Sequence, residues 1–466
     1  MEEAAGKTLK KAPGEKAAPT AREGALEVLE QIDQGAYANL ALDQYLEGAG
    51  KELSRLDKGF LTELVQGTVK YRLYLDWIID SLLKNPARLK PGPRNVLRLG
   101  LYQLCFLDRV PARAACFETV KLAKKKYHEG VGSLVNGVLR NWLRDSSQVV
   151  WPDEKENPAE YLSVCYSHPL WMTQRWLARY GLEGARTFCE YNNASPELWL
   201  RTNTLKASRE QLILRLREEG CQVEPGRYAP EAVELVGGPP VRRLEAFMEG
   251  AVTVQDQSSM LVAHALQPRP GQQVLDVCAA PGGKTTHIAQ LMQDQGCLKA
   301  WDVHPHRVAL IAENARRLGI TCIHPQAHDA LALPEGEELA AFDRVLVDAP
   351  CSGLGVLRRR ADARWRKTPE EIREITKLQR QILHGALDRL APGGRLVYST
   401  CTVEPEENAM LVDEVLAEKE KQAPGRFRPA PLGLEALGLP AGCQLQCLPF
   451  YHELEGFFLA AIERSL

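Results

Sequence analysis

The sequence predicts a multidomain chain with an all-α front domain, a small α+β domain and a C-terminal α/β domain with a doubly wound, Rossmann-like sheet. Three observations predict it. Apolar residues recur at helical spacing from 21 to 145, short strand and helix signals mix between 161 and 254, and strands alternate with helices over 255–466. A length of 466 residues suits about three domains.

The front part divides into a tail and a helical domain. Residues 1–20 consist mainly of Ala, Lys, Glu, Pro and Gly, which predicts a disordered tail. From 21 to 145 the apolar spacing is helical, as in the run from Leu75 to Leu83, and prolines such as Pro86 and Pro111 separate the helices. Strand-like alternation does not occur in this part, so we expect an all-helical domain.

The charge of the chain is unevenly distributed. Residues 1–150 hold 23 Lys and Arg against 18 Asp and Glu, although the whole chain has a net charge of −2. The basic residues gather at 88–98 and 121–126, which favours phosphate contact, although a solvated helix face would have the same pattern. Twelve cysteines without a CxxC pair, and no signal peptide or membrane-length apolar run, predict a cytoplasmic protein with reduced thiols and without a membrane partner. We expect this protein to be a monomer.

Between the front domain and the α/β part the composition changes twice. Residues 146–160 are rich in Pro, Asp and Glu and predict a linker. Residues 161–254 contain a helix from Pro169 to Tyr180, a capped helix at 208–219, and short strands near Val223 and Val233. We therefore expect a small α+β domain.

The α/β part opens with a strand that runs through a glycine turn into a helix. Residues 274–277 are mostly apolar, Gly282 and Gly283 follow, and 285–292 is helical in pattern. The turn places free backbone N–H groups at the carboxyl end of the strand, where open α/β sheets bind ligands. The glycine spacing fits neither a dinucleotide fingerprint nor a Walker A loop. It predicts a small-molecule site of another kind.

Acidic residues end the next strands. Asp302 ends the second strand, where a carboxylate can accept both hydroxyls of a ribose, and Asp329 ends the third strand, where it could reach an adenine edge. A helix cap is the alternative interpretation of one such residue. Several in register favour a nucleoside-bearing cofactor.

Cysteines follow the fourth and fifth strands. Cys351 comes after Asp348 and Cys401 comes after the strand 395–399, and these strands should be neighbours in a doubly wound sheet. The thiolate is the nucleophilic form of cysteine. Two thiols beside a carboxylate suit attack on an electron-poor ring, whereas a buried inert cysteine is the common alternative.

Several runs together resemble a known family. They are Asp-Val-Cys-Ala-Ala-Pro-Gly-Gly-Lys at 276–284, Asp-Ala-Pro-Cys-Ser-Gly at 348–353 and Tyr-Ser-Thr-Cys-Thr-Val-Glu-Pro-Glu-Glu-Asn at 398–408, with accessory runs at 201–204 and 255–259. This text resembles the NOL/NOP/Sun family of S-adenosylmethionine-dependent RNA 5-methylcytosine methyltransferases. The front domain, through its runs at 59–68, 97–104 and 135–140, resembles the NusB-like RNA-binding domain.

The resemblance implies roles for individual residues. Cys401 is similar to the nucleophile that attacks C6 of the cytosine, Asp348 to the group that holds and protonates N3, and Cys351 to the thiol that assists product release. It also implies a cofactor site for S-adenosylmethionine. The implied cofactor residues are Cys278, Ala279, Ala280, Pro281, Gly282, Gly283, Lys284, Asp302, Asp329 and Asp348.

Together with the NusB-like front domain, the resemblance implies that the chain methylates C5 of a cytosine in small-subunit (16S) ribosomal RNA, without DNA as a partner and without a metal. Two alternatives remain open at the level of sequence. One is a transfer RNA cytosine methyltransferase with the same chemistry, and the other is a non-catalytic RNA-binding or antitermination factor. A DNA cytosine methyltransferase would use Cys351 as its nucleophile, but the additional Thr-Cys pair and the helical front domain count against it.

Overall fold

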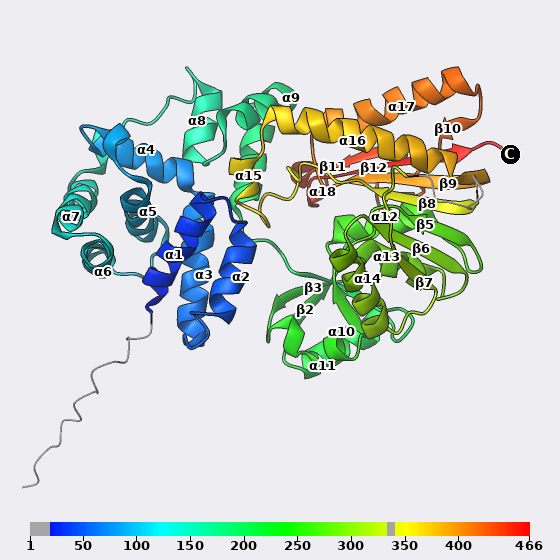
Figure 1. Cartoon of the computed structure of the whole chain (residues 1–466), viewed down its shortest axis with the longest axis horizontal. Coiled ribbons are helices and arrows are strands. Elements are labelled where there is room, and N and C mark those ends of the chain that lie inside the picture. Colours follow the sequence, from blue (N-terminus) through cyan, green and yellow to red (C-terminus); the bar gives the residue numbers. More distant parts are fainter. Residues whose placement is uncertain (1–18, 333–340) are drawn as a thin grey trace, which may run out of the picture. The chain divides into compact units, whose positions relative to one another are not determined.

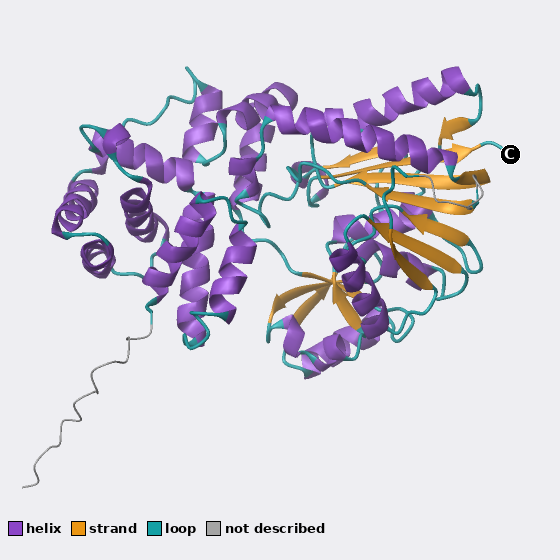
Figure 2. Cartoon of the chain, viewed as in Figure 1, coloured by secondary structure: helices purple, strands orange, loops and turns teal. Residues whose placement is uncertain are grey.

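The computed structural model describes residues 19–332 and 341–466, so nearly all of the predicted tail, 1–20, lies outside the described residues. The chain divides into two compact units. The first comprises Met1–Asn193 and Arg360–Asp362, and the second comprises Ala194–Arg359 and Ala363–Leu466. Figure 2 shows that the strands of the described chain all belong to the second unit. The predicted all-helical front part is therefore confirmed.

The first unit is built from helices joined by short connections (Figure 1). They are α1 (Ala21–Asp33), α2 (Ala38–Glu47), α3 (Arg55–Lys70), α4 (Arg72–Leu82), η1 (Pro86–Arg88), α5 (Pro91–Phe106), α6 (Ala112–Lys126), α7 (Glu129–Arg144), η2 (Ser146–Gln148), α8 (Pro158–Cys165) and α9 (Leu170–Asn193). Helix α5 is central, because it packs on α1, α3, α4, α6 and α7.

Close packing around α5 depends on a glycine of α3. A Cβ on Gly67 would lie 1.9 Å from Cζ of Tyr102, so the ring of Tyr102 in α5 can lie against the α3 backbone only because Gly67 has no side chain. Leu64 in α3 and Leu97 in α5 are fully buried in the same interior. The apolar spacing that predicted these helices is thus the spacing of their buried faces.

The predicted linker region, 146–160, contains η2 and the first turn of α8. The helix predicted to end at Tyr180 does end there, because Gly181 is non-helical (φ 67°) and separates it from a second helical stretch; the two stretches together form α9, which runs to Asn193. The predicted domain boundaries stay predictions, because the two compact units divide the chain at a different point, after Asn193.

The second unit begins with a four-stranded antiparallel sheet in the order β2-β3-β1-β4. Its elements are β1 (Trp199–Thr202), α10 (Arg209–Glu218), β2 (Gln222–Pro225), β3 (Ala232–Gly237), η3 (Val241–Arg243), α11 (Glu245–Met248) and β4 (Val252–Val254). Helix α10 packs on this sheet through Leu212 and Leu216. The sheet and its helices confirm the α+β character predicted for this part.

The rest of the second unit forms an eight-stranded sheet with the strand order β10-β12-β9-β8-β5-β6-β7, in which β11 pairs with β12. Its strands are β5 (Gln273–Asp276), β6 (Cys297–Asp302), β7 (Ile323–Ala327), β8 (Phe342–Asp348), β9 (Leu390–Thr400), β10 (Phe427–Pro429), β11 (Gln444–Cys447) and β12 (Phe457–Arg464). Its helices are α12 (Gln257–Leu266), α13 (Gly283–Leu291), α14 (Pro305–Leu318), α15 (Ala363–Arg366), α16 (Pro369–Asp388), η4 (Pro405–Glu407), α17 (Ala409–Gln422), η5 (Glu435–Leu437) and α18 (Pro449–His452).

The predicted doubly wound sheet is antiparallel at one edge. Strands β5 to β9 pair in parallel, but β12 is antiparallel to β9, and β10 and β11 are antiparallel to β12. A buried apolar strand has the same sequence pattern in either direction, so the pattern of β12 could not reveal its direction. Helix α16 ends at Asp388, because Leu390 already belongs to β9.

Helices cover both faces of this sheet (Figure 1). Alternate residues of a strand point to opposite faces, and accordingly Val274 packs in the cluster that contains α12, α13 and α14, whereas Leu275 packs with α16 and α17. Strand β5 has β6 on one side and β8 on the other, so the direction of winding changes beside its carboxyl end. Ligands of open α/β sheets bind at such a point. Within the described ranges, no helix is long and apolar enough to cross a membrane.

Candidate active site

The glycine turn between β5 and α13 is held rigidly by its own backbone. Ala279 N donates to Trp301 O at 2.7 Å and Gly282 N donates to Ala279 O at 2.7 Å. Gly282 has φ 100°, a conformation that favours glycine, and a Cβ on Gly283 would meet no atom within 4 Å. The turn therefore presents open backbone at the amino end of α13.

All the cofactor residues predicted in 278–284 lie in this turn and the first residues of α13. The peptide bond between Ala280 and Pro281 is cis. Cys278 is partly buried, and burial raises the pKa of its thiol well above the usual value, with Asp276 adding to the effect. Cys278 is therefore a protonated, unreactive thiol rather than a third candidate nucleophile.

A buried carboxyl group lies under the turn. Asp276, at the end of β5, accepts a hydrogen bond from Thr285 Oγ1 at 2.7 Å. Burial raises the pKa of Asp276 to about 7. The group thus changes its charge near neutral pH, inside the element that shapes the turn.

Asp302 is buried at the end of β6 and is partly engaged by its own chain. Its Oδ1 accepts from His304 N at 3.0 Å, and its Oδ2 lies 3.3 Å from Nη1 of Arg307. Each carboxylate oxygen can accept two hydrogen bonds, so one acceptor site remains on each oxygen. Asp302 can therefore cap its own loop and still bind the hydroxyls of a ribose.

Asp329 lies two residues beyond β7 and is exposed. Its Oδ1 accepts from Leu331 N at 3.0 Å, so the side chain caps its own turn. The ends of β6 and β7 are joined by His328 N, which donates to Asp302 O at 3.1 Å. The structure places Asp329 at the predicted edge of the sheet but gives its carboxylate a local partner.

A lysine and a carboxylate connect the glycine turn to the end of β8. Lys284 Nζ lies 2.8 Å from Asp348 Oδ2, and Ser399 Oγ donates to Asp348 Oδ1 at 2.9 Å. Burial alone would lower the pKa of Lys284, but Asp348, Cys401 and Asp276 together outweigh burial and raise it. The lysine is therefore charged, and the sequence gave no sign that it pairs with Asp348.

The two predicted catalytic cysteines are in direct contact. Sγ of Cys351 and Sγ of Cys401 are 3.3 Å apart, within hydrogen-bonding distance for sulfur. The hydrogen bond with Cys401 and burial hold the pKa of the Cys351 thiol well above its usual range. The attraction that raises the pKa of Lys284 includes the charge of Cys401, so the lysine lies near that sulfur as well. Two thiols, a carboxylate and an ammonium group thus gather at one edge of the sheet.

The sequence also gave no role to Glu407. This residue of η4 is fully buried and accepts hydrogen bonds from Ser352 N at 2.8 Å and from Thr402 Oγ1 at 2.9 Å. These donors are the residues that follow Cys351 and Cys401. A charged residue in the polar run 404–408 looks like solvated surface in sequence, and only the position of that run inside the 398–408 motif could have indicated it.

The chain matches known families over most of its length. Residues 263–463 match the family described as 16S rRNA methyltransferase RsmB/F, residues 19–144 match the NusB family, and residues 168–242 match the ferredoxin-like domain of RsmF/B-like methyltransferases. A curated relative from Bacillus subtilis (strain 168), named probable ribosomal RNA small subunit methyltransferase B, is 39% identical over 95% of this chain and 98% of its own. The chain belongs to the RsmB/F family of 16S rRNA methyltransferases.

Other members agree with this assignment. The ribosomal RNA small subunit methyltransferase B of Proteus mirabilis (strain HI4320) is 35% identical over 94% of this chain and 97% of its own. Among solved structures, PH0851 has a TM-score of 0.76 with 27% identity over 98% of this chain and all of its own. NSun6 from Pyrococcus horikoshii, solved with SFG, has a TM-score of 0.54 with 25% identity over 63% of this chain and 97% of its own. The predicted resemblances to RNA methyltransferases and to NusB are confirmed.

Several of the basic residues at 88–98 and 121–126 form ion pairs within the first unit. Arg98 is buried and lies 2.6 Å from Asp76, and Arg94 lies 2.8 Å from Asp80. These two members of the basic cluster at 88–98 are therefore engaged within the unit, because they hold α5 to α4. On α6, the run 124–126 also pairs with glutamates of the first unit.

Another set of basic residues in the first unit is exposed. It surrounds a groove between the carboxyl ends of α4 and α7, with apolar lining from residues such as Leu89 and Val138. Within the described ranges, none of the four cations forms an ion pair, although the charge of Arg144 acts on the neighbouring Asp145, and no acidic residue lines the groove. This basic groove is lined by Lys84, Arg88, Arg140 and Arg144.

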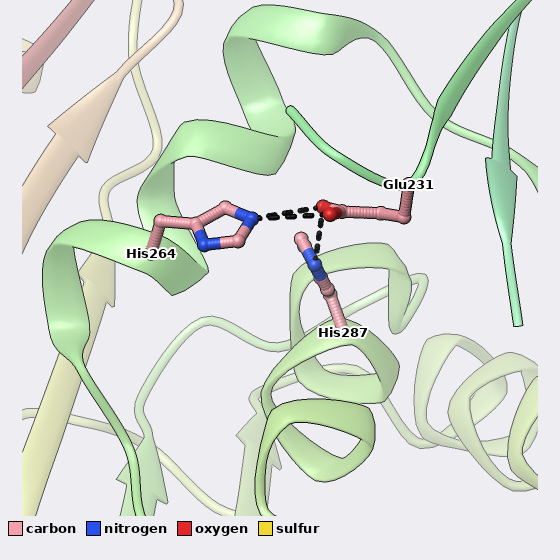
Figure 3. A group of neighbouring side chains, drawn as sticks. All are labelled: Glu231, His264 and His287. Carbon is pink, nitrogen blue, oxygen red and sulfur yellow. Dashed lines mark hydrogen bonds and ion pairs between the residues drawn. The ribbon is translucent and has the colours of Figure 1, made fainter. Parts of the chain in front are cut away.

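One further cluster of potential ligands lies in the second unit. Figure 3 shows Glu231, His264 and His287 pointing toward one another from three separate segments. His264 Nε2 lies 3.0 Å and His287 Nε2 lies 2.7 Å from Glu231 Oε1. Burial lowers the pKa of His287 to about 4, so its imidazole is neutral.

The surroundings of this cluster explain it without a metal. Nδ1 of His287 is buried with no hydrogen-bond partner in the described chain, whereas a metal-bound imidazole usually donates that N–H to an acceptor. The guanidinium of the fully buried Arg201 also acts on Glu231 and His287, and it would repel a bound cation. The cluster is best described as a hydrogen-bonded junction between α12, α13 and the segment before β3.

Proposed function

We propose that this chain transfers a methyl group from S-adenosylmethionine to C5 of a cytosine in 16S ribosomal RNA, through a covalent bond between Cys401 and C6 of the base. The observation that carries the proposal is the contact between two thiols at 3.3 Å beside the Lys284–Asp348 pair. A binding protein needs no such group of reactive side chains. The family to which the chain belongs supports the reaction class and the substrate.

The residues at the strand ends fit the cofactor. Gly283 faces open space at the amino end of α13, and Asp302 keeps one free acceptor site on each carboxylate oxygen for a pair of ribose hydroxyls. The Asp329 carboxylate would accept a hydrogen bond from the adenine edge once its present hydrogen bond from Leu331 N is broken. When bound, the sulfonium supplies an electrophilic methyl group. The chain's own part is to hold the nucleoside at this edge of the sheet.

Cys401 is the better nucleophile of the two thiols. The Lys284 ammonium lies near it and favours its thiolate, whereas the Cys351 thiol stays protonated. A thiolate adds to C6, and the electron pair of the C5–C6 bond moves onto C5 and N3. Asp348 is the group proposed to hold N3 and, once it carries a proton, to donate that proton to N3 as negative charge develops there; Lys284 and Ser399 orient its two oxygens.

Cys351 completes the reaction after methylation. The proton on C5 passes to water acting as a base, its electron pair re-forms the C5–C6 double bond, and the bond between Cys401 and C6 breaks with its electron pair returning to sulfur. Because Cys351 lies in contact with Cys401 and keeps its proton, it can stabilise the departing thiolate through a hydrogen bond. This assignment makes Cys351 necessary for release but not for attack.

The front unit supplies the RNA surface in this proposal. The basic groove would meet phosphates, in keeping with the match of residues 19–144 to the NusB family. We propose the domain limits 21–145, 161–254 and 255–466, with a single copy of the chain acting in the cytoplasm on RNA and not on DNA.

The decisive experiment separates the two cysteines. Cys401→Ser should abolish methylation of 16S rRNA, because a hydroxyl is far less ionised near neutral pH than a thiol with an ordinary pKa of about 8.5. Cys351→Ser should allow attack and methyl transfer but slow release, so a covalent protein–RNA adduct should accumulate. Denaturing gels measure the adduct, and mass analysis of 16S rRNA measures 5-methylcytosine.

Each competing function predicts a different result. An adduct in Cys401→Ser but not in Cys351→Ser would reverse the two roles. Methylated transfer RNA with unmodified 16S rRNA would identify the other RNA substrate. Binding of rRNA without methylation by the wild-type protein would favour a non-catalytic RNA-binding factor.

A further inference from the structure

Glu407 joins the two loops that carry the thiols. Its Oε1 accepts from Ser352 N at 2.8 Å and from Gln379 Nε2 at 3.1 Å, and its Oε2 accepts from Ser352 Oγ at 2.5 Å and from Thr402 Oγ1 at 2.9 Å. Four donors on two oxygens satisfy an ionised carboxylate. Burial nevertheless raises the pKa of Glu407, which shows that these donors compensate burial only in part.

The donors come from three separate elements. Ser352 follows Cys351 after β8, Thr402 follows Cys401 after β9, and Gln379 lies on α16. Gln379 Nε2 also donates to Pro350 O at 2.9 Å, so the residue before Cys351 is held as well. Ser352 Oγ and Thr402 Oγ1 are 2.8 Å apart. One carboxylate thus fixes the chain directly beside both sulfur atoms.

On this basis we propose that Glu407 is the positioning residue of the reaction. Its carboxylate ties the loop after β8 to the loop after β9, holds the two sulfur atoms in contact, and keeps Cys351 as the thiol that donates a hydrogen bond to the thiolate of Cys401. The inference rests on the proposed function for its catalytic meaning, but the contacts exist without it.

The charges around the sulfur atoms are arranged asymmetrically. Glu407 adds to the effects that hold the pKa of Cys351 high, after the hydrogen bond with Cys401 and burial. Lys284 lies near Cys401 instead. Tyr398, a further ionisable neighbour of Cys351, is buried, and its hydroxyl donates to the backbone oxygen of Glu407 at 2.7 Å. The charge of Glu407 thus acts on Cys351, and the charge of Lys284 acts on Cys401.

The test uses a reagent that reports on the distance between two thiols. Phenylarsine oxide condenses with two neighbouring thiols, forms two As–S bonds and releases water, without oxidation or reduction. It requires neither RNA nor methyl donor, so its result does not depend on methyltransferase activity. The chain has 12 cysteines, so peptide mapping and the Cys401→Ser protein define the signal that belongs to the 351–401 pair.

Three variants separate position from charge. Glu407→Ala removes all four acceptor contacts and should slow bridging of the pair at least about tenfold. It should also lower kcat for rRNA methylation by a similar factor while KM for RNA changes little. Glu407→Gln keeps a planar group that can bond both loops, so it should bridge nearly as fast as wild type. Glu407→Asp keeps the charge but is one methylene shorter, so its two thiols should react slowly with phenylarsine oxide. If Glu407→Ala does not fold, Glu407→Asp alone tests the positioning role.

The effect of the Glu407 charge on the Cys351 thiol is measured separately, in proteins that also carry Cys401→Ser. There Glu407→Gln should shift the midpoint of Cys351 alkylation by iodoacetamide to lower pH, because the nearby anion is gone. Glu231→Gln, which also removes a buried hydrogen-bonded carboxylate of the second unit, is the matched control and should leave both bridging and midpoint unchanged.

Two results would overturn the inference. Wild-type bridging in both Glu407→Ala and Glu407→Asp would show that the strands alone hold the sulfur atoms together. An unchanged alkylation midpoint in Glu407→Gln would remove the electrostatic role. If instead the wild-type protein bridges its thiols but methylates no RNA, the proposed function fails and the positioning role of Glu407 remains.

Discussion

The buried carboxyl group of Asp276 makes the stability of the second unit depend on pH in an unusual direction. Burial raises its pKa from 3.8 to about 7 in the folded chain. Between these values the unfolded chain has lost the proton while the folded chain still holds it, so unfolding becomes easier as pH rises. Above pH 7 both states are ionised and the penalty is constant.

The size of the effect follows from the shift. One pKa unit corresponds to about 1.4 kcal/mol, so the ionised Asp276 destabilises the folded state by about 4 kcal/mol above pH 7. Asp276→Asn should avoid this penalty. The amide can donate to Thr285 Oγ1, which then donates to Ala279 O, already 3.3 Å away. The stability advantage of the variant should therefore grow by about 3 kcal/mol between pH 5 and pH 8.

Urea unfolding followed by fluorescence at several pH values measures this difference. The comparison between variant and wild type at each pH cancels the contribution of the other titrating groups. Asp294→Asn is a control of opposite sign, because three hydrogen bonds from Thr321 and Cys322 outweigh burial and lower the pKa of Asp294. That variant should lose stability at neutral pH and little at acid pH. A pH-independent effect of Asp276→Asn would refute the reasoning.

Other contacts of the site give further predictions. Asp302→Ala removes a charged acceptor worth roughly 1.5–3 kcal/mol, so calorimetry should show at least about a tenfold loss of S-adenosylmethionine affinity, and unchanged affinity would exclude Asp302 from the site. Gly355→Ala places a Cβ 1.7 Å from Gly456 O and disturbs the hydrogen bond from Gly355 N to Cys401 O. Both Tm and the methylation rate should therefore fall, and wild-type values of both would contradict this packing. Replacing the basic groove with Gln should reduce the salt slope of rRNA binding by about 3, whereas replacing the ion-paired 124–126 should reduce it less, and equal slopes would count against the groove.

The sequence was most informative where a local pattern has one physical meaning. Helical spacing in the front part identified buried helix faces, since only a helix brings such residues to one side. Polar groups after apolar strands identified the edge of the sheet, because parallel strands end at a common edge. This logic placed Asp302 at the end of β6 and Cys401 directly after β9, where the structure has them.

The sequence was less informative where the outcome depends on a partner far along the chain. The direction of β12 depends on the strand it joins, and its apolar pattern is the same in either direction. Arg94 and Arg98 looked like a basic surface, yet aspartates of the preceding helix engage them. A charged residue has the same letter whether it faces solvent or a buried partner, so only packing distinguishes the two cases.

The catalytic pair illustrates how these two levels combine. Strands β8 and β9 pair Asp348 with Ser399, and Cys351 and Cys401 follow those positions by three and two residues. Pairing of the strands therefore brings the loops together, but unequal offsets cannot by themselves set two sulfur atoms in contact. Glu407 accepts hydrogen bonds from both loops and lies outside both strands. The sheet thus brings the two loops to one edge, and we infer that a carboxylate that no strand pattern predicts holds the two thiols in contact there.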